Sequence, residues 1–261
     1  MTCKICGSET RHVFTEKVLG KYSADFNHCG ACGFLFAGEP HWINEAYSDA
    51  IVPGDTGLVQ RNIHISQRLT PLFFYLYGNN GAYIDLAGGT GLLVRLMRDA
   101  GFDFYWNDTY CTNTHAVGFK SSPGGKFTAV TAFEVLEHLV DPFDFVANAL
   151  NENHAQLFTF STELYSGNPP KPQDWWYYAF QAGQHISFYQ LETLMIIAKR
   201  LGLEVCSYGG LHFIGSTELV KKINFFYSSK FARLTTRYRM RRALKSKTFD
   251  DHILMIGKES S

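Results

Sequence analysis

The sequence lacks a net charge and a long apolar run. Its 24 lysines and arginines are balanced by 24 aspartates and glutamates, so no overall field would draw the chain to nucleic acid or to an anionic membrane. No apolar stretch approaches the roughly 20 residues that a membrane-spanning helix needs. No signal-peptide core follows the opening residues Met1-Thr2-Cys3-Lys4. Together these absences favour a soluble, cytoplasmic protein.

A third glycine is missing from the most informative stretch of the chain. Residues 82–91 read AYIDLAGGTG, an apolar run that leads into a glycine turn and then into a helical pattern. Such a turn seats a nucleotide-like ligand at the edge of an open α/β sheet. The dinucleotide fingerprint G-x-G-x-x-G would need another glycine where Val94 stands. The turn therefore disfavours NAD as the ligand.

Two acidic residues near this turn indicate which cofactor it takes. Asp85 lies just before the glycines, where a carboxylate would repel a pyrophosphate but can hold the ammonium of a methionine moiety. Asp108 ends the next strand pattern and can accept hydrogen bonds from both ribose hydroxyls. A sulfonium cofactor therefore fits this pair of acids better than a nicotinamide cofactor does.

These motifs resemble those of class I S-adenosylmethionine-dependent methyltransferases. The resemblance rests on residues 85–91, on Asp108, and on residues 127–142, FTAVTAFEVLEHLVDP, which are similar to the fourth strand and following loop of methyltransferases that act on small molecules. It implies an α/β fold with a doubly wound, mostly parallel, Rossmann-like sheet. The cofactor-binding residues that it implies are Asp85, Ala87, Gly88, Gly89, Gly91, Asp108, Phe133 and Glu134.

Four of the six cysteines form two pairs, Cys3-x-x-Cys6 and Cys29-x-x-Cys32, each followed by glycine. Two such pairs about 20 residues apart can place four thiolates in a tetrahedron around Zn2+. A disulfide pairing is the alternative, but it needs an oxidising compartment. Four cysteines leave no open coordination position, so we expect a structural zinc that supplies the folding energy of this short segment.

A zinc ribbon ahead of this core resembles sugar C-methyltransferases and related enzymes of bacterial polysaccharide and antibiotic-sugar pathways. We therefore expect a zinc ribbon over residues 1–38 and a class I methyltransferase domain over residues 81–261. Residues 39–80 between them are expected to form a linker, which contains Pro53 and Gly54, and a packing helix.

Hydrophobic periodicity places the expected elements. Apolar residues at helical spacing predict a helix over residues 57–77, ended by Gly78. Short apolar runs that alternate with helical patterns then predict a mostly parallel sheet. Its strands are expected near residues 82–87, 102–107, 116–119, 127–133, 155–161, 203–208 and 251–256, and its helices near residues 91–100, 142–151 and 191–201.

The segment from about residue 217 to residue 248 is basic and carries aromatic residues, among them Phe225, Phe226 and Phe231. A basic amphipathic helix can lie on anionic lipid or grip phosphates. Charge runs are more often the solvated face of a helix, so peripheral membrane contact is not favoured. We expect a helical insertion here, before the last strand.

The candidate catalytic residues follow from the resemblance. In this topology the loop after the fourth strand lies beside the acceptor, which makes His138 the first candidate base and Glu137 its orienting carboxylate. His185 is the second candidate base, because it ends a long connection that reaches over the acceptor pocket in the resembled family. The alternative for each is a structural role. Likewise, the aromatic residues at 174–180 either stack on the acceptor or hold this connection in place by hydrophobic packing.

The leading hypothesis is an S-adenosylmethionine-dependent methyltransferase that acts on a small molecule, namely a sugar or sugar-nucleotide of a surface glycan pathway. Two alternatives stay open. One is methylation of RNA or protein, since zinc ribbons often bind such partners, although the neutral net charge disfavours nucleic acid. The other is a non-catalytic interaction protein on a methyltransferase scaffold.

Overall fold

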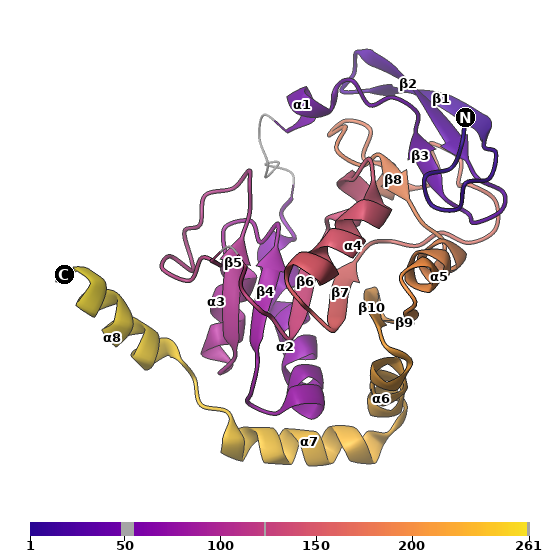
Figure 1. Ribbon diagram of the computed structural model, residues 1–261. Coiled ribbons are helices and arrows are strands. Elements are labelled where there is room, and N and C mark those ends of the chain that lie inside the picture. The colour runs from indigo at the N-terminus through magenta and orange to yellow at the C-terminus, as the bar shows by residue number, and fades with distance from the viewer. Residues whose placement is uncertain (48–54, 123, 260–261) are drawn as a thin grey trace. The chain divides into compact units, whose positions relative to one another are not determined.

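The computed structural model describes residues 1–47, 55–122 and 124–259, which fall into two compact units (Figure 1). The first unit comprises Met1–Val52, Phe133–Asn148 and Thr159–Gly215, and the second comprises Pro53–Ala132, Ala149–Phe158 and Ser216–Ser261. Residues 48–54 of the predicted linker, with Pro53 and Gly54, lie outside the described residues.

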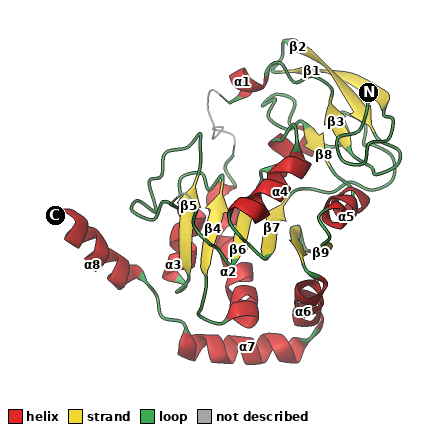
Figure 2. Ribbon diagram, in the orientation of Figure 1, coloured by secondary structure: helices red, strands yellow, loops and turns green. Residues whose placement is uncertain are grey.

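Six strands form the expected mostly parallel sheet, and helices alternate with them along the chain (Figure 2): β4 (Ala82–Leu86), β5 (Asp103–Asn107), β6 (Ala129–Phe133), β7 (Leu157–Ser161), β9 (Glu204–Tyr208) and β10 (Leu211–Gly215). Their order is β5-β4-β6-β7-β10-β9. β4 pairs in parallel with β5 and β6, whereas β9 and β10 form an antiparallel hairpin. All but β10 begin and end within two residues of a predicted strand.

Helices form where the sequence has apolar residues at helical spacing: α2 (Leu58–Tyr77), α3 (Leu92–Asp99), α4 (Pro142–Glu152), α5 (Leu191–Arg200), α6 (Thr217–Ser228), α7 (Lys230–Ala243) and α8 (Thr248–Glu259). α2 ends at Gly78 as predicted, because its φ of +70° is a conformation that glycine adopts without strain. α3 begins at Gly91 and buries Leu93, Val94 and Met97.

The first unit holds a second sheet, in the order β1-β2-β3-β8, with the bounds β1 (Arg11–Val18), β2 (Tyr22–His28), β3 (Leu35–Ala37) and β8 (Ser187–Phe188). β8 pairs antiparallel with β3, so the cysteine-rich N-terminal segment shares a sheet with the segment that carries His185. The unit also contains three short helical segments: α1 (Ile43–Ala46), η1 (Leu136–His138) and η2 (Trp176–Tyr178).

Two predicted strands are wrong. Residues 116–119 turn instead of extending, because the Phe119 N–H donates to the Ala116 carbonyl and Gly118 has a φ of +90°. Residues 251–256 lie in α8, not in a strand. Helical geometry brings Asp251 and Met255 to one side, where Asp251 pairs with Arg98 and Met255 packs against Gly118.

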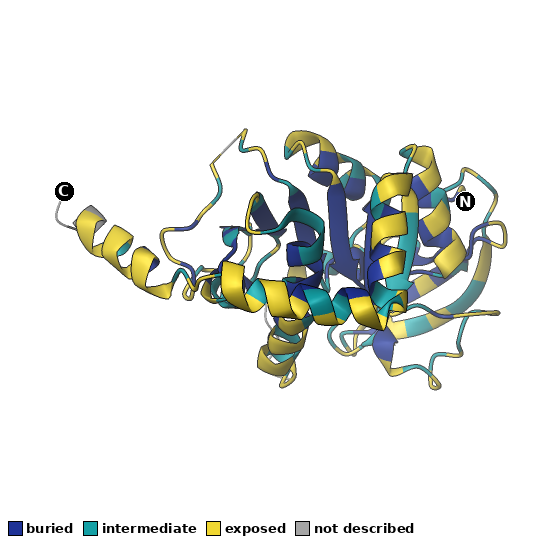
Figure 3. Cartoon of the chain, turned by 90° about the horizontal axis from the view of Figure 1, so that it is seen from below, coloured by how far each residue is buried: buried dark blue, intermediate teal, exposed yellow. Residues whose placement is uncertain are grey.

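The basic segment folds as two helices, α6 and α7, and a further helix follows it where a strand was predicted. α7 buries Ala232 and Thr236, and most of its surface is exposed (Figure 3). Its exposed side chains include Phe231, Leu234, Arg237, Tyr238, Arg239, Arg241 and Arg242. Among the described helices, none is both long enough and apolar enough to cross a membrane.

Candidate functional site

The glycine turn between β4 and α3 depends on left-handed backbone conformations. The φ angles are +53° at Ala87, +54° at Gly89 and +84° at Gly91. Gly88 is needed for a different reason, since a Cβ there would lie 3.0 Å from Cδ1 of Trp106. Ala87 adopts its conformation at a cost of about 1 kcal/mol, because its Cβ approaches the following backbone.

Asp85 is almost fully buried at the end of β4. Its Oδ1 accepts a hydrogen bond of 2.6 Å from the hydroxyl of Thr131, the residue opposite it on β6. Burial raises the pKa of this carboxyl to about 7, helped by the charge of Asp108 and opposed by the Thr131 hydrogen bond. A cation beside Asp85 would favour its charged form.

Asp108 lies against the glycine turn. Its Oδ2 accepts from the Gly89 N–H at 2.9 Å, and its Oδ1 accepts from the N–H groups of Tyr110 and Cys111 at 2.7 and 2.8 Å. The Trp106 indole donates to the Gly89 carbonyl at 2.8 Å. A carboxylate has about four acceptor positions, so Asp108 keeps capacity for a ligand hydroxyl. The second unit thus brings Asp85, the turn and Asp108 together.

The first unit brings together the three predicted catalytic residues, Glu137, His138 and His185. One ligand-type atom from each lies within 4.8 Å of the others, and the two imidazole centroids are 4.9 Å apart. Nδ1 of His138 is 3.1 Å from the Gln184 carbonyl, and Nδ1 of His185 is 2.6 Å from the Tyr177 carbonyl. Because a carbonyl only accepts, each Nδ1 carries a proton, and Nε2 is the nitrogen that offers a lone pair when the imidazole is neutral.

Backbone contacts hold this cluster in place. The Ile186 N–H donates to the Glu137 carbonyl at 2.8 Å, and the Tyr189 hydroxyl donates to the Leu136 carbonyl at 2.5 Å. The Ser187 hydroxyl donates to the Leu139 carbonyl at 2.6 Å. η1 is therefore fixed to the residues on either side of β8.

The cluster is strongly desolvated. Glu137 is fully buried, and no described residue hydrogen-bonds to either carboxylate oxygen. Burial raises the pKa of Glu137, although the charge of His185 and the nearby hydroxyls of Tyr177 and Thr162 oppose the shift. Burial, with the charge of His185, lowers the pKa of His138 to about 3, so this imidazole is neutral at physiological pH.

The two remaining predicted cofactor residues end β6. Phe133 is its last residue and is half-buried. Glu134 has a φ of +55°, its N–H donates to the Ser161 hydroxyl at 3.0 Å, and that hydroxyl donates back to Oε1 at 2.6 Å. In the aromatic stretch, Tyr177 and Tyr178 belong to the buried core of the first unit, whereas Trp176 is 79% exposed.

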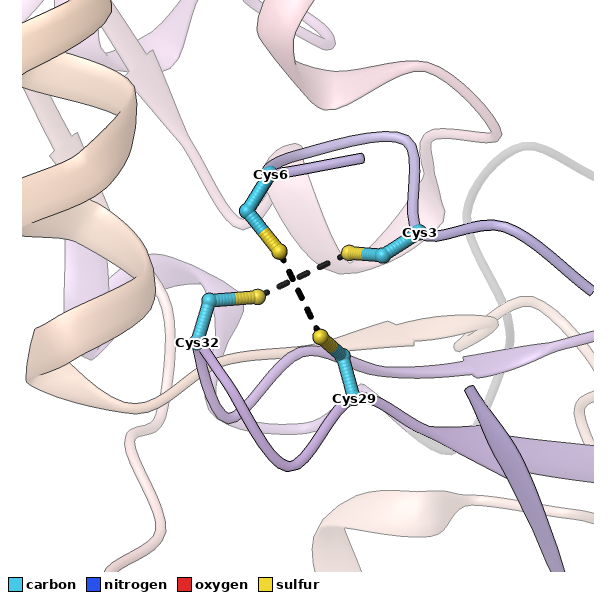
Figure 4. A group of neighbouring side chains, drawn as sticks. All are labelled: Cys3, Cys6, Cys29 and Cys32. Atoms are coloured by element: carbon cyan, nitrogen blue, oxygen red, sulfur yellow. Dashed lines mark hydrogen bonds between the residues drawn. The ribbon is translucent and has the colours of Figure 1, made fainter. Parts of the chain in front are cut away.

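The four predicted metal ligands converge (Figure 4). The sulfurs of Cys3 and Cys32 are 3.6 Å apart, and those of Cys6 and Cys29 are 3.4 Å apart. A disulfide would need about 2.05 Å. Sulfurs 2.3 Å from a central zinc ion would be about 3.8 Å apart in a tetrahedron, which is close to the observed spacing. The geometry therefore fits a four-thiolate metal site.

Residues far along the chain anchor the cysteine loops. The Thr193 hydroxyl donates to the Cys32 carbonyl at 2.7 Å, and Arg200 donates to the Ile5 carbonyl at 2.7 Å. The Tyr165 hydroxyl donates to the Gly33 carbonyl at 2.5 Å. The sequence analysis missed these three residues, and no local signal in the sequence identifies them.

A comparison with models of protein families shows which family residues 60–208 match. The model of the methyltransferase domain family matches residues 60–208, more than half of the chain. The chain belongs to this methyltransferase domain family. The matched range contains both the Asp85–Asp108 arrangement and the Glu137–His138–His185 cluster. A comparison with curated proteins finds no match.

Solved methyltransferases are among the structures to which this methyltransferase domain protein is similar. An O-methyltransferase family protein from Burkholderia thailandensis is 13% identical, with a TM-score of 0.46, over 61% of this chain and 57% of that chain. Magnesium protoporphyrin IX methyltransferase from Synechocystis PCC 6803, solved with bound S-adenosylmethionine, is 13% identical, with a TM-score of 0.40, over 67% of this chain and 91% of that chain. The match thus spans less than two thirds of the Burkholderia protein.

Proposed function

We propose that this methyltransferase domain protein transfers a methyl group from S-adenosylmethionine to a small molecule. The observation that carries the proposal is that one compact unit holds Asp85, the glycine turn and Asp108, with Asp108 accepting a hydrogen bond from the Gly89 N–H of the turn. Asp85 would hold the ammonium of the methionine moiety, and Gly88, Gly89 and Gly91 would admit the cofactor close to the backbone. Asp108 would accept from a ribose hydroxyl.

The electrostatics of Asp85 support this assignment. Its pKa of about 7 means that the buried carboxyl is readily neutralised without a ligand, and an ammonium beside it would restore the charge. Phe133 and Glu134 at the end of β6 are proposed as further cofactor contacts, and Ala87 as part of the turn. This part of the proposal comes from the resemblance to class I methyltransferases.

The acceptor is proposed to be a sugar or sugar-nucleotide, on the resemblance to zinc-ribbon sugar methyltransferases. A hydroxyl or carbon acceptor must lose a proton as it attacks the methyl group. We assign that task to Glu137, His138 and His185. The neutral state of His138, whose Nδ1 donates to the Gln184 carbonyl so that Nε2 carries the lone pair, supports the assignment.

The four cysteines are proposed to hold a structural zinc ion. Four thiolates would complete its coordination, so the ion would take no part in the reaction. Its role would be to stabilise the N-terminal segment, whose strand β3 pairs with β8. By that route the zinc would help to position His185.

Methyl transfer to defined acceptors tests the small-molecule assignment. The zinc-loaded protein is incubated with S-adenosylmethionine labelled in the methyl group and, in parallel, with sugar-nucleotides, total RNA or a protein extract. We expect label in the sugar-nucleotide fraction, and none with the Asp108→Ala variant. Label only in RNA or protein would overturn the small-molecule assignment. No transfer to any of the three by a protein that binds the cofactor would overturn it as well.

A further inference from the structure

Glu137 poses an electrostatic problem in the first unit. Its side chain is fully buried, and neither of its carboxylate oxygens has a hydrogen-bond partner among the described residues. The hydroxyls of Thr162 and Tyr177, which oppose the rise of its pKa, hydrogen-bond to each other at 3.2 Å, and neither is a cation. An unpaired buried carboxylate is costly, so such a group either carries a proton or faces a cation.

Both neighbouring imidazoles are oriented as metal-binding histidines are. Each turns its Nδ1–H toward a backbone carbonyl, that of Gln184 for His138 and that of Tyr177 for His185. This hydrogen bond fixes the tautomer and the ring plane, and it leaves Nε2 as a ligand atom. The Gln184 carbonyl lies two residues before Ile186, whose N–H donates to the Glu137 carbonyl of η1.

We propose that Glu137, His138 and His185 form a second metal site, for a divalent transition-metal ion. Their ligand-type atoms lie within 4.8 Å of one another, a spacing at which the three side chains could hold one ion. Two imidazoles and one carboxylate suit Zn2+, Fe2+ or Co2+ better than Mg2+ or Ca2+, which prefer oxygen ligands. Three protein ligands leave coordination positions open, unlike the four cysteines.

An open position gives the ion a role in the reaction, and this part of the inference rests on the proposed function. An acceptor hydroxyl bound to the ion is more acidic than a free one. Its proton passes to solvent, its oxygen forms the bond to the methyl carbon, and the electron pair of the broken C–S bond stays on the cofactor sulfur. Glu137, His138 and His185 would then act as ligands of the ion, and the ion would replace them as the group that promotes loss of the acceptor proton.

Metal content measured without cofactor or acceptor tests the site separately from the activity. The full chain is produced in media supplemented with zinc, iron or cobalt, and the metal-to-protein ratio is measured by mass spectrometry. The variants are Glu137→Gln, which keeps the side-chain volume, and His185→Asn. The matched control is His64→Asn, because His64 is an exposed histidine away from the cluster in the sequence.

We expect two ions per chain in the wild type and the control, and one ion in both variants. When cobalt fills both sites, the thiolate charge-transfer absorption should come from the four-cysteine site. Loss of the second cobalt ion in the variants should therefore leave this absorption unchanged. One ion in the wild type under every supplement would overturn the proposal, and so would two ions in Glu137→Gln. If His185→Asn fails to fold, Glu137→Gln decides the question.

Discussion

The buried Asp85 carboxyl should make the stability of the protein depend on pH. Its folded-state pKa is about 7, against 3.8 for the ordinary carboxyl, so between about pH 4 and pH 7 the folded chain holds a proton that the unfolded chain has lost. The free energy of unfolding from this group therefore falls as the pH rises through that window. At about 1.36 kcal/mol per pKa unit, the buried Asp85 costs about 4 kcal/mol at pH 8, where it is ionised, and about 2 kcal/mol at pH 5, where the folded chain must take up a proton.

Asp85→Asn removes this cost. Asparagine keeps an oxygen that accepts from Thr131, but it buries an amide N–H group, which costs about 1–3 kcal/mol where it finds no partner. We therefore expect the variant to be about 1–3 kcal/mol more stable than the wild type at pH 8. At pH 5 the gain should be smaller by about 2 kcal/mol.

Urea denaturation at the two pH values measures this difference, with Asp174→Asn as the control because Asp174 is exposed. The control should change stability equally at both pH values. A stability difference between Asp85→Asn and the wild type that is the same at pH 5 and pH 8 would refute the reasoning.

Three further predictions concern stability. Removal of metal from the cysteine cluster should unfold the N-terminal segment, at a cost on the order of 10 kcal/mol, and a melting curve unchanged by chelator would contradict this. Ala87→Gly should stabilise the protein by about 0.5–1 kcal/mol in urea denaturation, because it relieves the left-handed strain, and a loss of stability would count against the assigned turn. Arg98→Met should cost about 1.5–3 kcal/mol in the same assay, because it removes two charged hydrogen bonds of 2.6 and 2.8 Å and leaves buried Asp251 with Arg95 as its remaining cationic partner. A loss below about 1 kcal/mol would show that this pair is unimportant.

The central strands and helices could be predicted because their sequence patterns are local. β4 is an apolar run, a glycine turn follows it, and α3 has apolar residues at helical spacing. The strand predicted at residues 251–256 failed because a short apolar run has no unambiguous period. What decided its structure is the contact of Asp251 with Arg98, more than 150 residues away.

The candidate sites likewise contain some residues that local sequence patterns identify and others that they do not. The cysteine pairs and the Asp85–Asp108 motif are local, so the sequence alone could identify them. Thr131 could not be identified, because its bond to Asp85 depends on the register of β4 against β6. The paired Nδ1 hydrogen bonds of His138 and His185 depend on backbone geometry, which no pattern of residue types encodes.

Titration calorimetry of S-adenosylmethionine into the zinc-loaded full chain tests the central claim most directly. S-adenosylhomocysteine is titrated alongside, with NAD as the negative control and Asp108→Ala as the site variant. We predict binding at a micromolar Kd, about −8 kcal/mol, that is lost in Asp108→Ala and absent for NAD. A folded, metal-loaded protein that binds neither S-adenosylmethionine nor S-adenosylhomocysteine would contradict the proposed cofactor site.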